Sequence, residues 1–160
     1  MNGWLMTFAH WLQNTPWALA IASSDYAYPF VQLTHFTGLS LWVGTSIALD
    51  LRLMGFGRRE PASQLLDTLL AWNWIGFGIA VAGGFMLFSI AAPSYVTNPA
   101  FRYKLGVFLP LALILHIVVQ RRTSKWSQGP NSPRVARVAG LLEVLLWLAV
   151  ASSAVCIPYF

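Results

Sequence analysis

Residues 30–59 read FVQLTHFTGLSLWVGTSIALDLRLMGFGRR, and this stretch decides the fold class. Its first twenty residues contain no Lys, Arg, Asp or Glu, which is typical of a helix that lives in lipid. The stretch nevertheless holds His35, and Asp50 follows directly. Because polar groups are costly in hydrocarbon, a membrane helix turns them toward protein or water. We therefore expect a membrane helix here, with its polar face turned into a helical bundle.

The composition of the whole chain indicates a membrane protein. Of its 160 residues, 57% are hydrophobic and 9% are charged, whereas soluble domains have about 25% charged residues. Eight Trp and five Tyr fit an aromatic belt at the lipid–water boundary. The lipid bilayer is thus the first expected partner. The single cysteine excludes an intrachain disulfide and a thiolate metal cluster.

The formal charge of +5 does not indicate nucleic-acid binding. The basic residues lie at the edges of apolar runs, and they form no basic stripe that alternates with aromatic residues for base stacking. We expect no nucleic-acid partner and interpret these charges as orientation signals.

Four apolar segments are about long enough to cross the ~30 Å of hydrocarbon as helices. Their ranges are 30–49, 72–92, 105–120 and 138–157. The sequence therefore predicts an all-α polytopic membrane protein, a four-transmembrane-helix bundle that forms one domain over 1–160. We also expect a helix to open after Pro61 and run into the second segment, a turn-rich loop at 92–101, and a kink at Pro110.

The segment 1–25 is too polar and interrupted to cross the membrane. Trp4, Phe8 and Trp11 fall on one helical face. Such a pattern favours one or two short helices that lie flat in the membrane interface.

The Lys and Arg residues predict the orientation. One side of the expected bundle holds eight of them, which are Arg52, Arg58, Arg59, Arg121, Arg122, Lys125, Arg134 and Arg137. The other side holds Arg102 and Lys104. Because cytoplasmic loops carry the excess of positive charge, the larger set is expected in the cytoplasm and both termini on the outer, periplasmic side.

A helical wheel at 100° per residue gathers the polar residues of 30–50 on one face. With His35 at zero, Ser46 falls at about 20°, Gln32 and Asp50 at about 60°, and Gly38 at about −60°. This face should look into the bundle.

Two further segments offer stripes that should also face inward. Small residues let another helix or a flat cofactor approach closely. In the second segment the stripe is Gly76, Ala80, Gly83 and Gly84, and in the fourth it is Ala136, Gly140, Glu143, Trp147 and Ala151.

Asp50, His116 and Glu143 come from three predicted helices, and each lies within about two turns of the nearest Arg on the expected cytoplasmic side. They are therefore expected to share one layer. Buried charges pair, take up a proton or bind a cation, so this layer is either a structural ion pair or a proton or metal site. Arg52 is the expected counter-ion of Asp50 or Glu143.

His35 is expected in the opposite half of the bundle, beside Gln32. It is either a hydrogen-bonded structural residue or an axial ligand of a b-type haem. A second ligand could be His10 or His35 of another copy across a two-fold axis, and a pair of His116 residues is allowed by the same symmetry. His35 and His116 of one chain differ in height by about 10 Å, so they should not sandwich one iron.

The motif His35-x-x-Gly38 with Asp50-Leu51-Arg52-Leu53-x-Gly55, and the later run NPAFRYKLGVF, resemble a family of small bacterial inner-membrane proteins of unassigned function. This resemblance covers most of the chain and implies four spans and an outward N-terminus in the bacterial inner membrane. A looser similarity links the chain to four-helix membrane cytochromes b and to copper-resistance membrane proteins, and it implies haem.

Three functions remain open after the sequence analysis. The first is electron transfer through haem b, alone or within a larger membrane redox complex or homo-oligomer. The second is a non-catalytic accessory or anchor subunit, and the third is a proton- or cation-handling protein that uses Asp50, His116 and Glu143. No hydrolase motif or phosphate-binding loop is present, so we expect no catalysis by the chain on its own except as a redox subunit.

Overall fold

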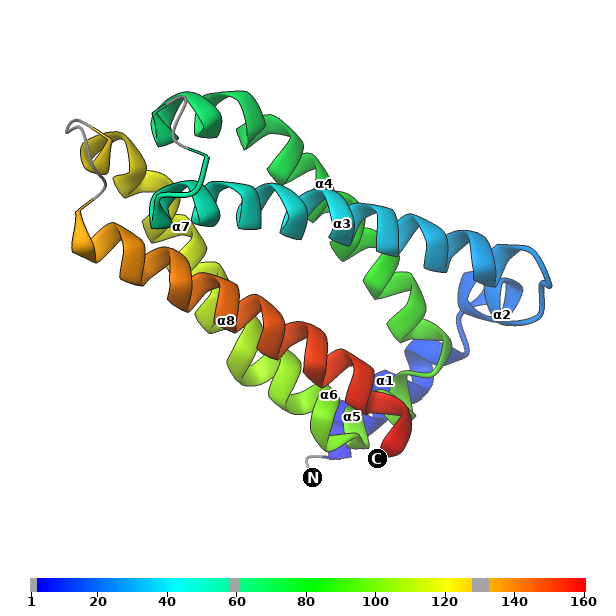
Figure 1. Cartoon of the computed structure of the whole chain (residues 1–160). Coiled ribbons are helices and arrows are strands. Elements are labelled where there is room, and N and C mark those ends of the chain that lie inside the picture. The colour runs from blue at the N-terminus through cyan, green and yellow to red at the C-terminus, as the bar shows by residue number, and fades with distance from the viewer. Residues whose placement is uncertain (1–2, 58–60, 128–132) are drawn as a thin grey trace.

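The computed structural model describes residues 3–57, 61–127 and 133–160, and every regular element in these ranges is helical (Figure 1). The expected all-α class is therefore confirmed. The α-helices are α1 (Gly3–Gln13), α2 (Pro16–Ala22), α3 (Ala27–Met54), α4 (Ala62–Ile90), α5 (Ala92–Thr97), α6 (Pro99–Tyr103), α7 (Leu109–Trp126) and α8 (Arg134–Cys156). A π-helical segment, Lys104–Phe108, joins α6 to α7, and a 3₁₀ turn, Ile157–Tyr159, follows α8.

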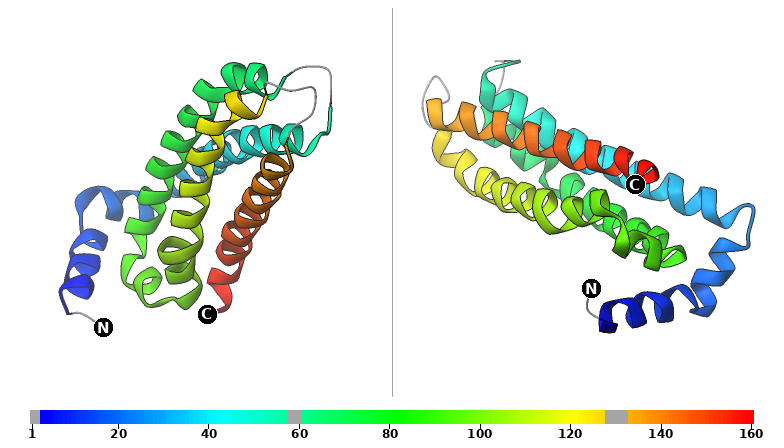
Figure 2. Two further views of the ribbon diagram at one scale, coloured as in Figure 1. Left: turned by 90° about the vertical axis from the view of Figure 1, so that its left-hand side faces the viewer. Right: turned by 90° about the horizontal axis from the view of Figure 1, so that it is seen from below.

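The four long helices α3, α4, α7 and α8 form the body of the molecule. Helix α3 crosses α4 and also packs on α8, while α7 lies along α8 (Figures 1 and 2). Both chain ends lie away from the C-terminal ends of α3 and α7 (Figure 1). A helical bundle is therefore what the sequence folds into.

Within the described ranges, three helices, and not the four expected, are long and apolar enough to cross a membrane. They are Ala62–Ile90, Pro99–Trp126 and Arg134–Tyr159. The prediction of a fourth such span at 30–49 is wrong by this criterion. With 28 residues, α3 is long enough, but Gln32, His35 and Asp50 are among several polar side chains that interrupt its apolar character.

Turn chemistry explains where the helices end. Helix α3 stops at Gly55, whose left-handed φ of 103° is accessible to glycine without strain. Pro61 caps α4, so this helix begins at the position expected from the sequence.

The expected loop at 92–101 is wrong, because this segment forms α5 and α6. Pro93 and Pro99 occupy first-turn positions, where the missing N–H costs nothing. The Asn98 side chain accepts a hydrogen bond from the Phe101 N–H at 3.0 Å and caps α6. Two first-turn prolines and one amide cap thus stabilise short helices in a segment whose composition predicts a loop.

The π-helical segment Lys104–Phe108 precedes Pro110, where a kink is expected. Proline has no N–H to donate within the helix, and widened turns are a common way of absorbing this loss. Helix α7 continues beyond it to Trp126.

Glycines bring α3 and α4 into close contact. A Cβ atom added to Gly38 would lie 2.4 Å from the Ala80 nitrogen, and one added to Gly76 would lie 2.6 Å from the Trp42 nitrogen. Backbone atoms cannot move aside locally, so both positions need a hydrogen in place of a side chain. The stripe Gly76, Ala80 and Gly83 is buried as the sequence predicts.

The buried stripe of α8 departs from the prediction at one position. Gly140, Glu143 and Trp147 are buried as expected, but Ala151 is exposed and Val150 is buried instead. The stripe drifts because 3.6 residues per turn do not fit a strict four-residue step.

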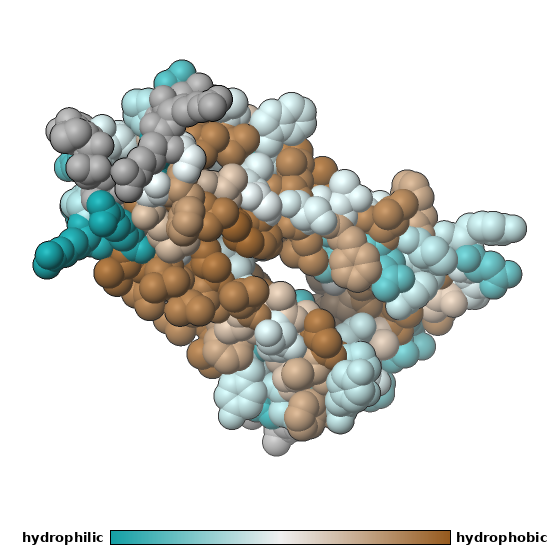
Figure 3. Space-filling model, viewed as in Figure 1, coloured by the Kyte–Doolittle hydropathy of each residue, from teal (hydrophilic) through white to brown (hydrophobic). Residues whose placement is uncertain are grey.

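Outward faces of the bundle are apolar. Ile114 is 62% exposed and Leu145 is 52% exposed, and hydrophobic residues cover much of the flank in Figure 3. Polar residues gather at the end where α3 and α7 end and α8 begins (Figures 1 and 3). This end, here called the basic end, carries Arg52, Arg121, Arg122, Lys125, Arg134 and Arg137. Apolar flanks with polar ends are typical of a protein embedded in a membrane.

The glycine contacts predict an asymmetry between two substitutions in α3. Gly38→Ala should destabilise the protein by about 1–3 kcal/mol, because its methyl group would overlap the α4 backbone. Gly44→Ala should be neutral or stabilising, since no atom lies within 4 Å of that Cβ and alanine is the better helix former. Thermal unfolding in detergent, followed by circular dichroism, measures both, and equal melting temperatures would contradict the close crossing.

Candidate functional site

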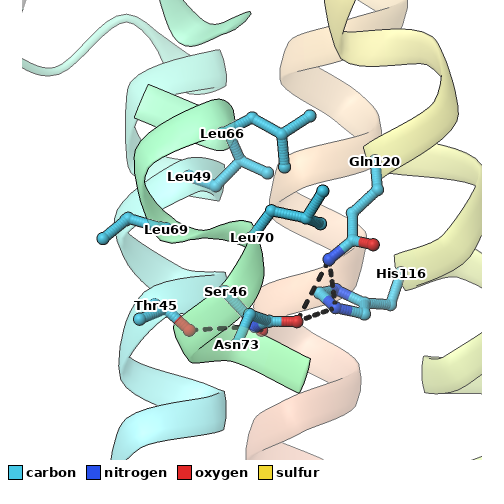
Figure 4. Close-up of a pocket in the computed structure, with 9 residues that line it drawn as sticks. All are labelled: Thr45, Ser46, Leu49, Leu66, Leu69, Leu70, Asn73, His116 and Gln120. Carbon is cyan, nitrogen blue, oxygen red and sulfur yellow. Dashed lines mark hydrogen bonds between the residues drawn. The ribbon is translucent and has the colours of Figure 1, made fainter. Parts of the chain in front are cut away.

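Asn73 of α4 lies at the centre of a buried polar network. Its Nδ2 donates to the Trp42 carbonyl at 3.0 Å, to Thr45 Oγ1 at 2.9 Å and to Ser46 Oγ at 2.9 Å. All three acceptors belong to α3, and Figure 4 shows the amide between this helix and His116. The close α3–α4 crossing is what lets a short amide side chain reach the neighbouring helix.

His116 of α7 has partners at both ring nitrogens. Nδ1 lies 2.5 Å from Glu143 Oε1, and Nε2 lies 2.9 Å from Asn73 Oδ1. The Gln120 Nε2 lies 2.8 Å from the same His116 Nε2 and donates to Asn73 Oδ1 at 3.1 Å (Figure 4). The His116 and Glu143 side chains are each 1% exposed, so their short contact is shielded from solvent.

Glu143 of α8 joins His116 to a second carboxyl group. Trp147 Nε1 donates to Glu143 Oε1 at 3.3 Å. Glu143 Oε2 and both Asp50 oxygens are buried without a donor. Asp50 and Glu143 are nevertheless within interaction range of each other. Two facing carboxylates are both acceptors, so a proton on one of them lets the pair form a hydrogen bond.

The expected layer of Asp50, His116 and Glu143 is therefore present, but Arg52 is not its counter-ion. Neither Asp50 oxygen nor Glu143 Oε2 has a hydrogen-bond partner among the described residues. Glu143 instead contacts His116, through Oε1 and Nδ1. The backbone of α3 explains this, because residues two apart on a helix point in different directions.

A small pocket lies beside the network, between α3, α4 and α7. It contains about 10 Å³ of free space, which is about the minimum for one water molecule. Its lining, drawn in Figure 4, is Thr45, Ser46, Leu49, Leu66, Leu69, Leu70, Asn73, His116 and Gln120.

Aromatic rings surround the other side of His116. The ring centroids of His116 and Trp147 are 5.9 Å apart, and those of Trp42 and Trp147 are 4.6 Å apart in an edge-to-face arrangement. Trp42 also packs edge-to-face on Phe77 at 4.7 Å. These rings exclude water and lower the local dielectric constant around the imidazole.

His35 of α3 contacts α4 at a separate site, further along α4 than Asn73. Its Nδ1 lies 2.7 Å from the Ala80 carbonyl oxygen, so Nδ1 carries the proton in the neutral ring. Gly84 lets the ring approach, since an added Cβ would lie 2.9 Å from its Cε1 atom. Asn73 and the segment Ala80–Gly84 are 7 to 11 residues apart, so His35 and His116 contact α4 about 10–16 Å apart along its axis.

His10 and Gln32 do not join His35 through any hydrogen bond or ring contact within the described part of the chain. His10 is exposed on α1, and Gln32 is half-buried on α3. In the described ranges no group of three or more His, Cys, Asp or Glu residues is arranged to hold a metal ion.

Sequence reasoning missed Asn73 as a site residue. Asn73 lies inside the predicted second segment, 72–92, where it was not singled out. Its isolated amide between two tryptophans, in the sequence WNW, was the available signal.

No protein-family model, curated protein or solved structure matches this chain. The resemblance to small inner-membrane proteins therefore stays a prediction, and the site must be interpreted from its own chemistry.

The hydrogen bonds of Asn73 predict a large effect on stability. Asn73→Ala should destabilise the protein by about 2 kcal/mol or more, because it leaves buried partners on α3 and α7 unsatisfied. Thr68→Ala on the same helix is the control, since its exposed hydroxyl bonds only to its own helix at Gln64. Chemical unfolding in detergent measures the difference, and equal stabilities of the two variants would contradict the network.

Proposed function

We propose that the chain is an integral membrane protein that binds protons and moves them across the bilayer through Asp50, Glu143 and His116. The observation that carries this proposal is the buried 2.5 Å contact between His116 and Glu143, next to a second carboxyl group without a donor. Ionisable groups that face one another between membrane helices are typical of proton relays.

A proton fits this site better than a metal cation. The imidazole contacts the Glu143 carboxylate directly, which leaves no gap for an ion between them. The adjoining pocket has room for about one water, whereas Na⁺ or Ca²⁺ needs a shell of several oxygen ligands. The pair Asp50 and Glu143 instead offers carboxylate oxygens that a single shared proton would bridge.

The partners of His116 suit proton transfer because each ring nitrogen has a hydrogen-bond partner both with and without a proton. When Nε2 lacks a proton, it accepts a hydrogen bond from Gln120 Nε2, and when it carries one, it donates to Asn73 Oδ1. Nδ1 likewise donates to ionised Glu143 or accepts from protonated Glu143. A proton can thus arrive at Nε2 while another leaves from Nδ1 to Glu143. Gln120 then loses Nε2 as an acceptor but keeps its hydrogen bond to Asn73 Oδ1.

The charge distribution supports an orientation with the basic end in the cytoplasm of a bacterial cell. Arg121, Arg122 and Arg137 lie at that end, while Arg102 and Lys104 lie near the chain termini. Helices α1 and α2 would then rest on the outer surface of the inner membrane. Trp4 and Trp11 are exposed on α1, as expected for residues that enter the interface.

Charge-neutralising variants test the proposed function. Glu143→Gln and Asp50→Asn should each lower proton flux into proteoliposomes at least about tenfold, since neither amide can take up and release a proton. The flux is measured with a pH-sensitive dye after a pH jump. Asp67→Asn is the matched control, because this carboxylate is exposed on α4. Wild-type flux in Glu143→Gln would refute the proposal.

A second candidate function, haem-b-based electron transfer, is favoured by the hydrogen bond of His35. Histidine ligands usually donate their other ring N–H to a carbonyl or carboxylate, as His35 Nδ1 does to Ala80. The Nε2 lone pair is then oriented as a ligand, and His35 of a second copy would supply the other axial position. Bound haem would supply one-electron chemistry, and the residues of the chain would hold and orient it.

This candidate predicts a coloured protein. Wild-type protein purified from haem-supplied cells should show a Soret band, and His35→Ala should lose it. His10→Ala should keep the band, because His10 is exposed and makes no contact with His35 in the described structure. A reduced-minus-oxidised absorption spectrum measures the effect. A colourless, folded wild-type protein would rule this candidate out and leave the proton site untouched.

A further inference from the structure

We propose that the pocket between α3, α4 and α7 holds the water molecule through which His116 exchanges protons, and that it opens only toward the basic end. This inference rests on the proposed function, because it names the access route to the same site.

The chemistry of the pocket suits one water molecule. Five of its lining residues are polar: Thr45, Ser46, Asn73, His116 and Gln120. Buried waters make about three hydrogen bonds, and these side chains supply both donors and acceptors. The free space of about 10 Å³ holds about one such molecule. A water here would lie beside His116, whose Nε2 is the nitrogen that receives the proton in the proposed transfer to Glu143.

The pocket reaches the surface of the bundle, and its lining extends from Asn73 toward the basic end, because Leu66, Leu69 and Leu70 precede Asn73 on α4. Leu70 is 37% exposed, and Gln120 is half-buried and directly precedes Arg121. Trp74 Nε1 donates to Gln120 Oε1 at 3.2 Å, which holds the amide in place at the rim. Leu66, on the same lining, lies in the second turn of α4, whose start is at that end (Figure 1).

The opposite side of His116 is closed. Trp42, Trp147 and Val150 are buried there with Ala80 and Ala112 in one apolar cluster, and Phe77 packs on its edge. The two tryptophans pack edge to face at 4.6 Å and so join α3 to α8 on this side of His116. In this conformation the relay therefore exchanges protons with the basic end alone. Delivery to the other side requires the Trp42–Trp147 contact to open.

Cysteine labelling in sealed vesicles tests this one-sided access. Cys156 is exposed, so it is first replaced by serine. Three single-cysteine variants are then compared: Leu69→Cys in the pocket, Val150→Cys in the buried cluster with Trp42 and Trp147, and Ser124→Cys, an exposed marker of the basic end. A membrane-impermeant thiol reagent is added to right-side-out and to inverted vesicles, and labelling rates are measured.

We expect Leu69→Cys to be labelled from the same face as Ser124→Cys. Val150→Cys should react roughly tenfold or more slowly from both faces, because a thiol in apolar surroundings ionises poorly. Labelling of Leu69→Cys from the face opposite Ser124→Cys, or as slowly as Val150→Cys, would overturn the inference. So would rapid labelling of Val150→Cys.

Flux measurements separate this inference from the proposed function. If labelling follows the expected pattern and Glu143→Gln retains wild-type flux, the water route stands and the transport function falls. If flux depends on Glu143 but the pocket is labelled from the wrong face, the function stands and this route is refuted.

Discussion

The contact chain Asn73–His116–Glu143 is the constraint on which the rest of the structure depends. It links α3, α4, α7 and α8 through hydrogen bonds of 2.5 to 3.0 Å, in a region where water cannot replace a lost partner. Because every buried donor or acceptor must find its partner, these hydrogen bonds fix the register of all four helices together. A slip of one helix by a single residue would leave several polar groups unsatisfied.

The glycines of the α3–α4 crossing serve this chain. Asn73 has a short side chain, so it reaches the Trp42 carbonyl only if the two backbones approach closely. Gly38 and Gly76 permit that approach because each lies against backbone atoms of the other helix. The glycines that pack α3 against α4 thus also position the proposed proton site.

The sequence predicted part of this arrangement for a clear physical reason. Helical periodicity assigns side chains to faces, so it predicted that His35 and Asp50 face the bundle and that Asp50, His116 and Glu143 share a layer. Periodicity does not determine which neighbour a side chain meets, so Arg52 was wrongly paired and Asn73 was missed. Hydropathy likewise marks 30–49 as apolar, yet its buried polar face keeps α3 below the criterion that the other three long helices meet.

The two proposed sites are independent because of how α4 is used. His116 meets this helix at Asn73 and His35 meets it at Ala80, about 10 Å apart along the axis. Trp42 and Phe77 pack together between these levels, and the two imidazoles have no hydrogen-bond partner in common among the described residues. Protonation of Glu143 therefore leaves the His35 tautomer unchanged, since Ala80 is a backbone acceptor that does not titrate. Coupling between the sites would pass through movement of α4, because among the described residues this helix is the element that both imidazoles contact through hydrogen bonds.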